Sequence, residues 1–237
     1  MKRIAISQPT YLPWYGYFAL IDYVDEFVFL NDVQFDKRSW QSRNYIKTSN
    51  DKLLLSANVK TKGKFSQNIN EVQLINYDIF STNHLKSIKL NYKKSKYFDL
   101  YFNEIKKIFD KRFDKLQDLN FEIINKINEL LGIKKKILFS SELNSNKKNF
   151  YKDEYLLEIC KKVDAEIYIS TIGAKKYLSK SKLFINKNIF IKYFEMNKFV
   201  YSQPNGQFVP NLSVLDILFN EGKEALNILR KNFILND

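Results

Sequence analysis

Residues Lys2–Leu30 (KRIAIS QPTYLPWYG YFALIDYV D EFVFL) decide the fold of this chain. Lys2–Ser7 predicts a buried strand, and Gln8–Gly16 predicts a tight loop because its two prolines fix φ. Tyr17–Val24 suits a short helix and Glu26–Leu30 a second strand. A strand, a helix and a strand within about 30 residues make a βαβ unit, which implies a parallel sheet. We therefore expect an α/β protein of Rossmann-like fold.

The rest of the chain continues with alternating strands and helices. From about Ile79 to Leu131, apolar residues recur every three or four positions, which predicts helices that end at Gly132. No repeat or linker divides the chain, so we expect one domain, 1–237, with a mainly helical insertion at about 79–132. The further strands that we expect are Leu53–Val59, Ile69–Leu74, Ile137–Ser140, Glu166–Ser170 and Ile189–Tyr193, the last of which closes the sheet. The further helices are Glu154–Val163, Lys175–Leu178, Ser213–Leu218 and Gly222–Asn232.

The composition suits a soluble protein with one substantial core. The chain has 237 residues, of which 45% are hydrophobic. No apolar run reaches the roughly 20 residues that a membrane-spanning helix needs, and the start of the chain does not read as a signal peptide. A single cysteine, Cys160, excludes an intramolecular disulfide, and its place among apolar helical positions indicates an inert core residue. We expect a cytoplasmic protein.

The formal net charge of +13 raises the alternative of a nucleic-acid partner. Residues 86–115 hold ten Lys or Arg against four acids, and residues 134–152 hold six against one. The basic residues are 34 lysines and only five arginines, whereas bidentate recognition of phosphates or bases prefers arginine. Two of the five arginines, Arg38 and Arg43, lie in a segment that is neither basic nor acidic overall.

The loop after the first strand holds four candidate binding residues, Gln8, Tyr11, Trp14 and Tyr17. Aromatic rings there can stack on a base or a sugar, or can simply belong to the core. An amide directly after an apolar strand needs hydrogen-bond partners. Ligands of parallel sheets bind at the carboxyl ends of the strands, so this loop should meet the residues that follow the second strand.

The segment after the second strand concentrates charged, amide and aromatic side chains. Asp32 at the strand end can act as a base, a cation ligand or a hydroxyl acceptor. Arg38 and Arg43 can clamp a diphosphate. The other candidate binding residues of this segment are Gln34, Trp40 and Asn44. The competing interpretation is a solvated, salt-bridged loop.

His84 is the only histidine, so any imidazole chemistry must use it. A single histidine on a helix is more often structural. No metal-ligand spacing accompanies it, and no nucleophile elbow is present. The sequence therefore predicts no metal site and identifies no cofactor.

Two later segments add candidate binding residues. Ser170 and Thr171 lie between a predicted strand and a predicted helix, where backbone N–H groups suit a phosphate or an ordinary helix cap. Gln207 belongs to an extended polar and aromatic segment, residues 202–211, of the kind that covers a site.

With these motifs the chain resembles the WbqC-like family, bacterial proteins associated with O-antigen and other surface-polysaccharide pathways. The family's ordered motifs match Ser7–Phe18, Asn31–Asn44, Tyr168–Leu178 and Phe208–Asp216, and a central histidine and tyrosine match His84 and Tyr92. Two positions depart from the family pattern: Ser7 stands for a histidine and Asn31 for the first acid of a pair. With the first histidine replaced, the match leaves His84, Asp32 and Arg43 as the better candidates: His84 and Asp32 as catalytic residues and Arg43 as a binding residue. It adds Tyr92 as a binding residue.

A fainter similarity links the chain to nucleotidylyltransferase-like folds. Their H-x-G-H motif follows the first strand, where this chain has Trp14-Tyr15-Gly16-Tyr17. The pathway association of the WbqC-like family implies an enzyme that transfers an acyl or aminoacyl group to the amine of a nucleotide-linked amino sugar, with aminoacyl-tRNA among the candidate donors. The alternatives are a non-catalytic protein that binds a nucleotide sugar or RNA, and a nucleotidyl-transfer enzyme.

Overall fold

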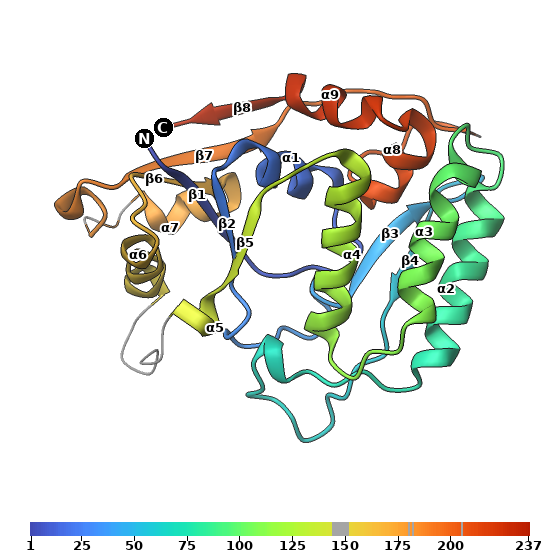
Figure 1. Ribbon diagram of the computed structural model, residues 1–237, viewed down its shortest axis with the longest axis horizontal. Coiled ribbons are helices and arrows are strands. Elements are labelled where there is room, and N and C mark those ends of the chain that lie inside the picture. Colours follow the sequence, from blue (N-terminus) through green and yellow to red (C-terminus); the bar gives the residue numbers. More distant parts are fainter. Residues whose placement is uncertain (144–151, 180, 182, 205) are drawn as a thin grey trace.

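The main sheet of the protein has six strands in the order β5-β2-β1-β6-β7-β8 (Figure 1). This computed structural model describes residues 1–143, 152–179, 181, 183–204 and 206–237, and every statement below refers to them. All neighbouring strands are parallel except β7 and β8. The strands are β1 (Arg3–Ser7), β2 (Glu26–Phe29), β5 (Lys136–Phe139), β6 (Ile167–Thr171), β7 (Phe190–Met196) and β8 (Phe233–Asn236). The predicted α/β fold with a mostly parallel, Rossmann-like sheet is confirmed.

The two faces of the sheet are covered by different helices, because side chains alternate along each strand. Ala5 of β1 and Phe27 of β2 belong to the larger hydrophobic core, together with α1 (Tyr15–Tyr23). Ile4 and Ile6 belong to a second core, together with α6 (Lys152–Lys162) and α7 (Lys175–Leu178). A central parallel strand buried on both faces explains the continuous apolar run in the sequence.

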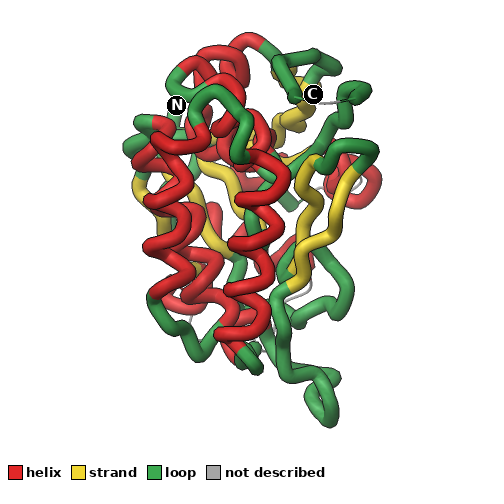
Figure 2. The backbone as a smooth tube through the Cα atoms, turned by 90° about the vertical axis from the view of Figure 1, so that its right-hand side faces the viewer, coloured by secondary structure: helices red, strands yellow, loops and turns green. Residues whose placement is uncertain are grey.

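The predicted helical segment consists of three helices that run alongside one another (Figures 1 and 2). They are α2 (Tyr77–Tyr92), α3 (Phe98–Asp110) and α4 (Leu116–Leu131). Gly132 ends α4 in the left-handed region at φ 77°, a conformation that glycine adopts without strain. The division into one domain with an insertion stays a prediction. Among the described helices, none combines the length and apolar character that crossing a membrane requires.

Two expected features of the sheet were wrong, and a third is confirmed only in part. The strand expected over Leu53–Val59 is present as β4 (Lys52–Ser56), but it ends earlier and pairs only with β3 (Arg43–Lys47), in a separate antiparallel hairpin. Ile69–Leu74 is not a strand: a capping box formed by Asn68 and Glu71 starts the 3-10 helix η1 (Ile69–Glu71). β7 does not close the sheet, because β8 pairs along its outer edge. The remaining elements are α5 (Ser140–Leu143), η3 (Ile172–Ala174), η4 (Ile185–Lys187), α8 (Val214–Glu221) and α9 (Glu224–Lys231).

The chain leaves the neighbouring strands β1 and β6 toward opposite faces of the sheet. After β1 it forms α1 on the face of the larger core. After β6 it passes through Leu178 and Phe184, which pack in the second core. Such a change of side opens a crevice at the carboxyl ends of the two strands, where open α/β sheets bind their ligands. The topology therefore predicts a site beside β1 and β6.

Candidate functional site

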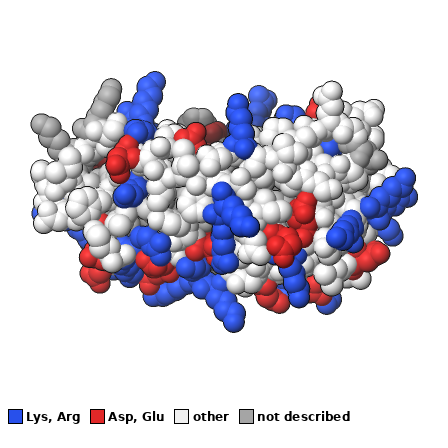
Figure 3. All heavy atoms as spheres, turned by 90° about the horizontal axis from the view of Figure 1, so that it is seen from above, with Lys and Arg blue, Asp and Glu red and all other residues white. Residues whose placement is uncertain are grey.

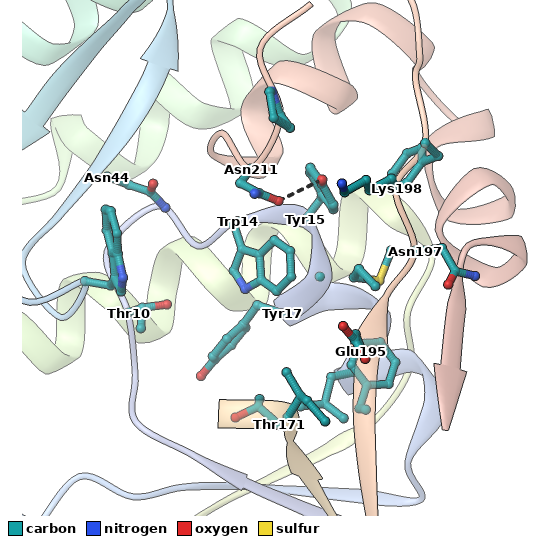
Figure 4. A pocket seen from close by; sticks show the side chains of 18 of the residues that line it. Thr10, Trp14, Tyr15, Tyr17, Asn44, Thr171, Glu195, Asn197, Lys198 and Asn211 are labelled. Carbon is teal, nitrogen blue, oxygen red and sulfur yellow. Dashed lines mark hydrogen bonds between the residues drawn. The ribbon is translucent and has the colours of Figure 1, made fainter. Parts of the chain in front are cut away.

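A cavity of about 850 Å³ lies at the carboxyl ends of β1, β6 and β7 (Figure 4). Thr10 follows β1 in the chain and lines it, as does Thr171 at the end of β6. Residues 194–200, from the end of β7 and the segment after it, form another part of the wall. The cavity therefore occupies the crevice that the strand order predicts.

Trp14 and Tyr17, from the start of α1, point into the cavity (Figure 4). A Cβ atom on Gly16 would lie only 2.4 Å from two ring carbons of Trp14 and 2.9 Å from Cγ of Met196. The missing side chain of Gly16 thus lets the indole lie close against the helix. Aromatic faces of this kind stack on sugar rings and bases.

Two tyrosine hydroxyls tie the aromatic wall to neighbouring segments. The Tyr15 hydroxyl donates a hydrogen bond to Oδ1 of Asn211 at 3.1 Å (Figure 4). The Tyr17 hydroxyl donates to the backbone oxygen of Gln8 at 3.1 Å. Burial raises the pKa of Tyr15 and raises that of Tyr17 further, so both hydroxyls stay protonated at neutral pH. The two hydroxyls therefore hold the cavity wall in position and do not act as a catalytic base.

Glu195 and Lys198 are the charged side chains among the described lining residues. Glu195 is half-buried at the end of β7, and one of its oxygens accepts a hydrogen bond from Nδ2 of Asn236 at 3.2 Å. Lys198 is exposed at the rim. The cavity thus combines aromatic faces and amides with one carboxylate and one ammonium group. This combination suits a polar ligand with a ring and a basic nitrogen.

Five of the residues predicted from sequence line this cavity: Trp14, Tyr17, Trp40, Asn44 and Thr171. Trp40 is 54% exposed at the rim. Asn44 is almost fully buried, and its Nδ2 donates to the Leu12 carbonyl at 2.7 Å, so it also holds the first loop in place. The other predicted residues do not line it: Gln8, Tyr11, Asp32, Gln34, Arg38, Arg43, His84, Tyr92, Ser170 and Gln207.

His84 lies beneath the first loop, not in the cavity. Its Nδ1 is 2.7 Å from the hydroxyl of Tyr11, and both side chains are buried. Burial lowers the pKa of His84 from 6.5 to about 4, against a weaker opposing effect from a backbone hydrogen bond with Ser56. The imidazole is therefore neutral at pH 7.

Asp32 follows β2, on the other side of β1 from the cavity. Ser140 donates a hydrogen bond to its Oδ1 at 2.5 Å, and the Tyr155 hydroxyl donates to its Oδ2 at 2.5 Å. Asn31 beside it receives a hydrogen bond from the backbone N–H of Ser141 at the start of α5. These contacts join the carboxyl ends of β2 and β5.

The remaining predicted residues outside the cavity make local contacts or lie on the surface. The Gln8 side chain accepts a hydrogen bond from Gln41 at 2.8 Å, and Gln34 donates to the Phe65 carbonyl at 3.1 Å. The Tyr92 hydroxyl accepts the backbone N–H of Lys47 at 2.8 Å. Ser170 is buried, Arg43 is half-buried on β3, and Arg38 and Gln207 are exposed.

Sequence reasoning missed the wall residues Tyr15, Glu195, Lys198 and Asn211. Glu195 lies near the end of β7 and Lys198 just after it, whereas the strand expected from the sequence stops at Tyr193, before this wall begins. The segment suspected of covering a site does contribute Phe208 and Asn211. The signal that could have found Glu195 is its position as a lone acid in an apolar strand near the sheet's carboxyl edge.

Part of the basic charge of residues 86–115 is paired with acidic side chains. Seen from above, Lys and Arg side chains are interspersed with Asp and Glu (Figure 3). On α3, Lys106 pairs with Asp110 and Lys107 with Glu104, each at 2.5 Å. Part of the second basic segment, residues 144–151 of 134–152, lies outside the described residues. RNA binding by these segments stays a prediction.

Comparisons with known proteins match almost the whole chain. A protein of Mycobacterium tuberculosis (strain ATCC 25618 / H37Rv) named "Uncharacterized protein Rv1507c" is 35% identical over 234 residues, which cover 97% of this chain and 98% of the relative. No solved structure matches significantly. The profile of the WbqC-like protein family matches residues 8–228. This chain therefore belongs to the WbqC-like protein family.

Proposed function

We propose that this protein is an enzyme of surface-polysaccharide (O-antigen) biosynthesis that transfers an acyl or aminoacyl group to the amine of a nucleotide-linked amino sugar. The observation that carries the proposal is the cavity itself, an aromatic chamber at the carboxyl ends of β1, β6 and β7 with a carboxylate in its wall. Rossmann-like sheets bind nucleotides and related ligands at this edge. The resemblance to surface-polysaccharide proteins supports the choice of pathway.

The cavity suits the sugar better than the diphosphate. Trp14 and Tyr17 provide faces for a sugar ring, and Asn211 and Thr171 provide groups for its hydroxyls. Arginine is absent from the described lining, and the one lysine, Lys198, lies at the rim. We therefore propose that the amino sugar enters the chamber and that Lys198 contacts a phosphate at its mouth.

Glu195 is the proposed proton acceptor. An amine attacks a carbonyl only in its neutral form, so a base must take up the proton that the nitrogen loses. In the proposed step, the nitrogen forms a bond to the acyl carbon, the donor's leaving group departs with its bonding electrons, and Glu195 receives the proton. Asn236 orients the carboxylate.

Catalysis by His84 and Asp32, and a diphosphate clamp formed by Arg38 and Arg43, stay predictions. The neutral, buried imidazole of His84 can accept a proton only through Tyr11 or after a local opening, because it does not line the cavity. Asp32 is enclosed by hydroxyl donors at the end of β2. Variants of His84 and Asp32 are therefore tested in the same assay as the Glu195 variant.

The test is a transfer assay read by mass spectrometry. The protein is mixed with nucleotide-linked amino sugars and with acyl-thioester or aminoacyl-tRNA donors, and the product is the acylated sugar. Glu195→Gln should lower turnover about 100-fold, which is the usual contribution of a general base. Glu224→Gln is the matched control, because Glu224 also accepts an asparagine hydrogen bond but lies outside the cavity.

The outcomes separate the hypotheses. Full activity of a folded Glu195→Gln variant would remove Glu195 from the mechanism. Loss of activity in His84→Gln or Asp32→Asn with retained folding would instead favour the roles predicted from sequence. Tight binding of the sugar without turnover on any donor would favour a non-catalytic binding protein.

A further inference from the structure

One wall of the cavity is connected through a glutamine side chain to the buried carboxylate of Asp216. The wall segment Phe208–Asn211 contributes Phe208, Pro210 and Asn211 to the cavity and has no regular secondary structure. Asn211 has a φ of 58°, in the left-handed region. A segment without a helical or sheet ladder needs other hydrogen bonds to keep one conformation.

The Gln203 side chain supplies these bonds. Its Oε1 accepts the backbone N–H of Val209 at 2.8 Å, and its Nε2 donates to the Val209 carbonyl at 2.9 Å. Val209 lies between Phe208 and Pro210, which both line the cavity. The amide therefore fixes the backbone at the centre of the wall segment.

Gln203 is in turn anchored to Asp216, in the first turn of α8. Oδ2 of Asp216 accepts from Nε2 of Gln203 at 2.7 Å and from the Tyr201 hydroxyl at 2.6 Å. Asp216 has no exposed surface, and burial raises its pKa, while bonds from Tyr201, Tyr92 and Gln203 and the charge of Lys47 oppose the rise. Burial of a carboxylate costs free energy, and the hydrogen bonds that Asp216 accepts offset this cost.

The opposite end of the wall segment is held independently. The Tyr15 hydroxyl, from the start of α1, donates to Oδ1 of Asn211. The segment is therefore fixed at Val209 through Gln203 and at Asn211 through Tyr15. Both anchors lie outside the segment, so its position follows the packed helices α1 and α8.

We propose that Asp216 and Gln203 are positioning residues that hold the wall segment Phe208–Asn211 in its ligand-binding position. The part that concerns ligand binding rests on the proposed function, whereas the position of the wall does not. Neither residue touches the cavity, so both act through the wall segment.

Tryptophan fluorescence reports on the position of this wall without an added label. The chain's two tryptophans, Trp14 and Trp40, both line the cavity, so tryptophan emission, excited at a wavelength that tyrosine does not absorb, comes from the cavity walls. Quenching by acrylamide measures how accessible the two indoles are and requires no ligand. Failure of the proposed function would therefore leave this measurement valid.

The test compares Gln203→Leu with Gln67→Leu. Gln67 is a buried glutamine whose Nε2 donates to the Lys60 carbonyl at 3.0 Å, and it lies outside the cavity lining, so its replacement shows what the loss of a buried amide elsewhere does to the quenching constant. We expect Gln203→Leu to raise the acrylamide quenching constant toward that of the urea-unfolded chain, and Gln67→Leu to leave it unchanged. Affinity for a bound nucleotide-linked amino sugar should fall about tenfold in Gln203→Leu only.

The conservative variant provides a rescue. Asp216→Asn keeps an oxygen acceptor and should retain the quenching constant of the unmodified protein, whereas Asp216→Leu should behave like Gln203→Leu. If Asp216→Leu does not fold, the comparison between Gln203→Leu and Gln67→Leu decides. Equal quenching constants in those two folded variants would overturn the proposal. A raised quenching constant with no binding of any nucleotide-linked amino sugar would support the wall anchor and count against the proposed function.

Discussion

The neutral state of His84 has a measurable consequence for stability. Its pKa is about 4 in the folded protein and 6.5 for an unperturbed imidazole. Between these values the unfolded chain binds more protons than the folded one, so the free energy of unfolding rises with pH. At 1.36 kcal/mol per pH unit, the rise amounts to about 3 kcal/mol across the full range.

The assay is urea unfolding at several pH values between 4.5 and 7.5, with His84→Gln as the comparison. Glutamine keeps an acceptor for the Tyr11 hydroxyl and does not titrate. Since this is the only histidine, the difference between the two stability curves isolates it from the carboxylates. Over this range the unmodified protein should gain about 2.5 kcal/mol more than His84→Gln.

Two results would refute this reasoning. Parallel stability curves for the two proteins would mean that the imidazole titrates alike in the folded and unfolded states. An NMR titration offers the direct check, because a single histidine gives a single set of imidazole signals to follow. A midpoint near 6.5 in the folded protein would show that the ring is not desolvated.

Three further predictions concern single positions. Gly16→Ala should push the Trp14 indole out of place and weaken ligand binding in a calorimetric titration, whereas Gly173→Ala, with open space around its Cβ, should bind normally. Burial raises the pKa of the Cys160 thiol, so a thiol reagent should react with it only as fast as the chain unfolds, and rapid reaction in native buffer would contradict this placement. Gly132→Ala should cost about 1 kcal/mol in urea unfolding because alanine is strained at φ 77°, and an unchanged midpoint would argue against this helix end.

The sequence predicted the fold wherever local pattern and tertiary packing agree. The run Lys2–Ser7 is apolar because β1 is buried on both faces, and this makes it recognisable. β8 was missed because Phe233–Asn236 is a short edge strand that pairs on one side only, which leaves a weak pattern. Ile69–Leu74 was misread because apolar residues over so short a run do not distinguish a strand from a 3-10 turn.

The candidate site could be predicted only in part, and topology explains why. The loops after β1 and β2 were expected to converge, since both follow strands of one parallel sheet. The crevice opens instead between β1 and β6, and it leaves Asp32 on the far side of β1. The crevice forms beside the neighbour of β1 from which the chain leaves toward the opposite face of the sheet. Which strand that is depends on the order of the strands, a long-range property that local motifs do not encode. Trp14 and Tyr17 were found because they stand beside β1 itself.

The central claim is that the ligand binds in the cavity beside Trp14 and Trp40. The most direct measurement is a fluorescence titration of the protein with nucleotide-linked amino sugars, with thermal stabilisation as an independent record of binding. The account predicts a saturable change in tryptophan emission at the same concentrations that raise the melting temperature. A ligand that stabilises the protein but leaves both tryptophans unaffected would contradict it, because that ligand would bind elsewhere.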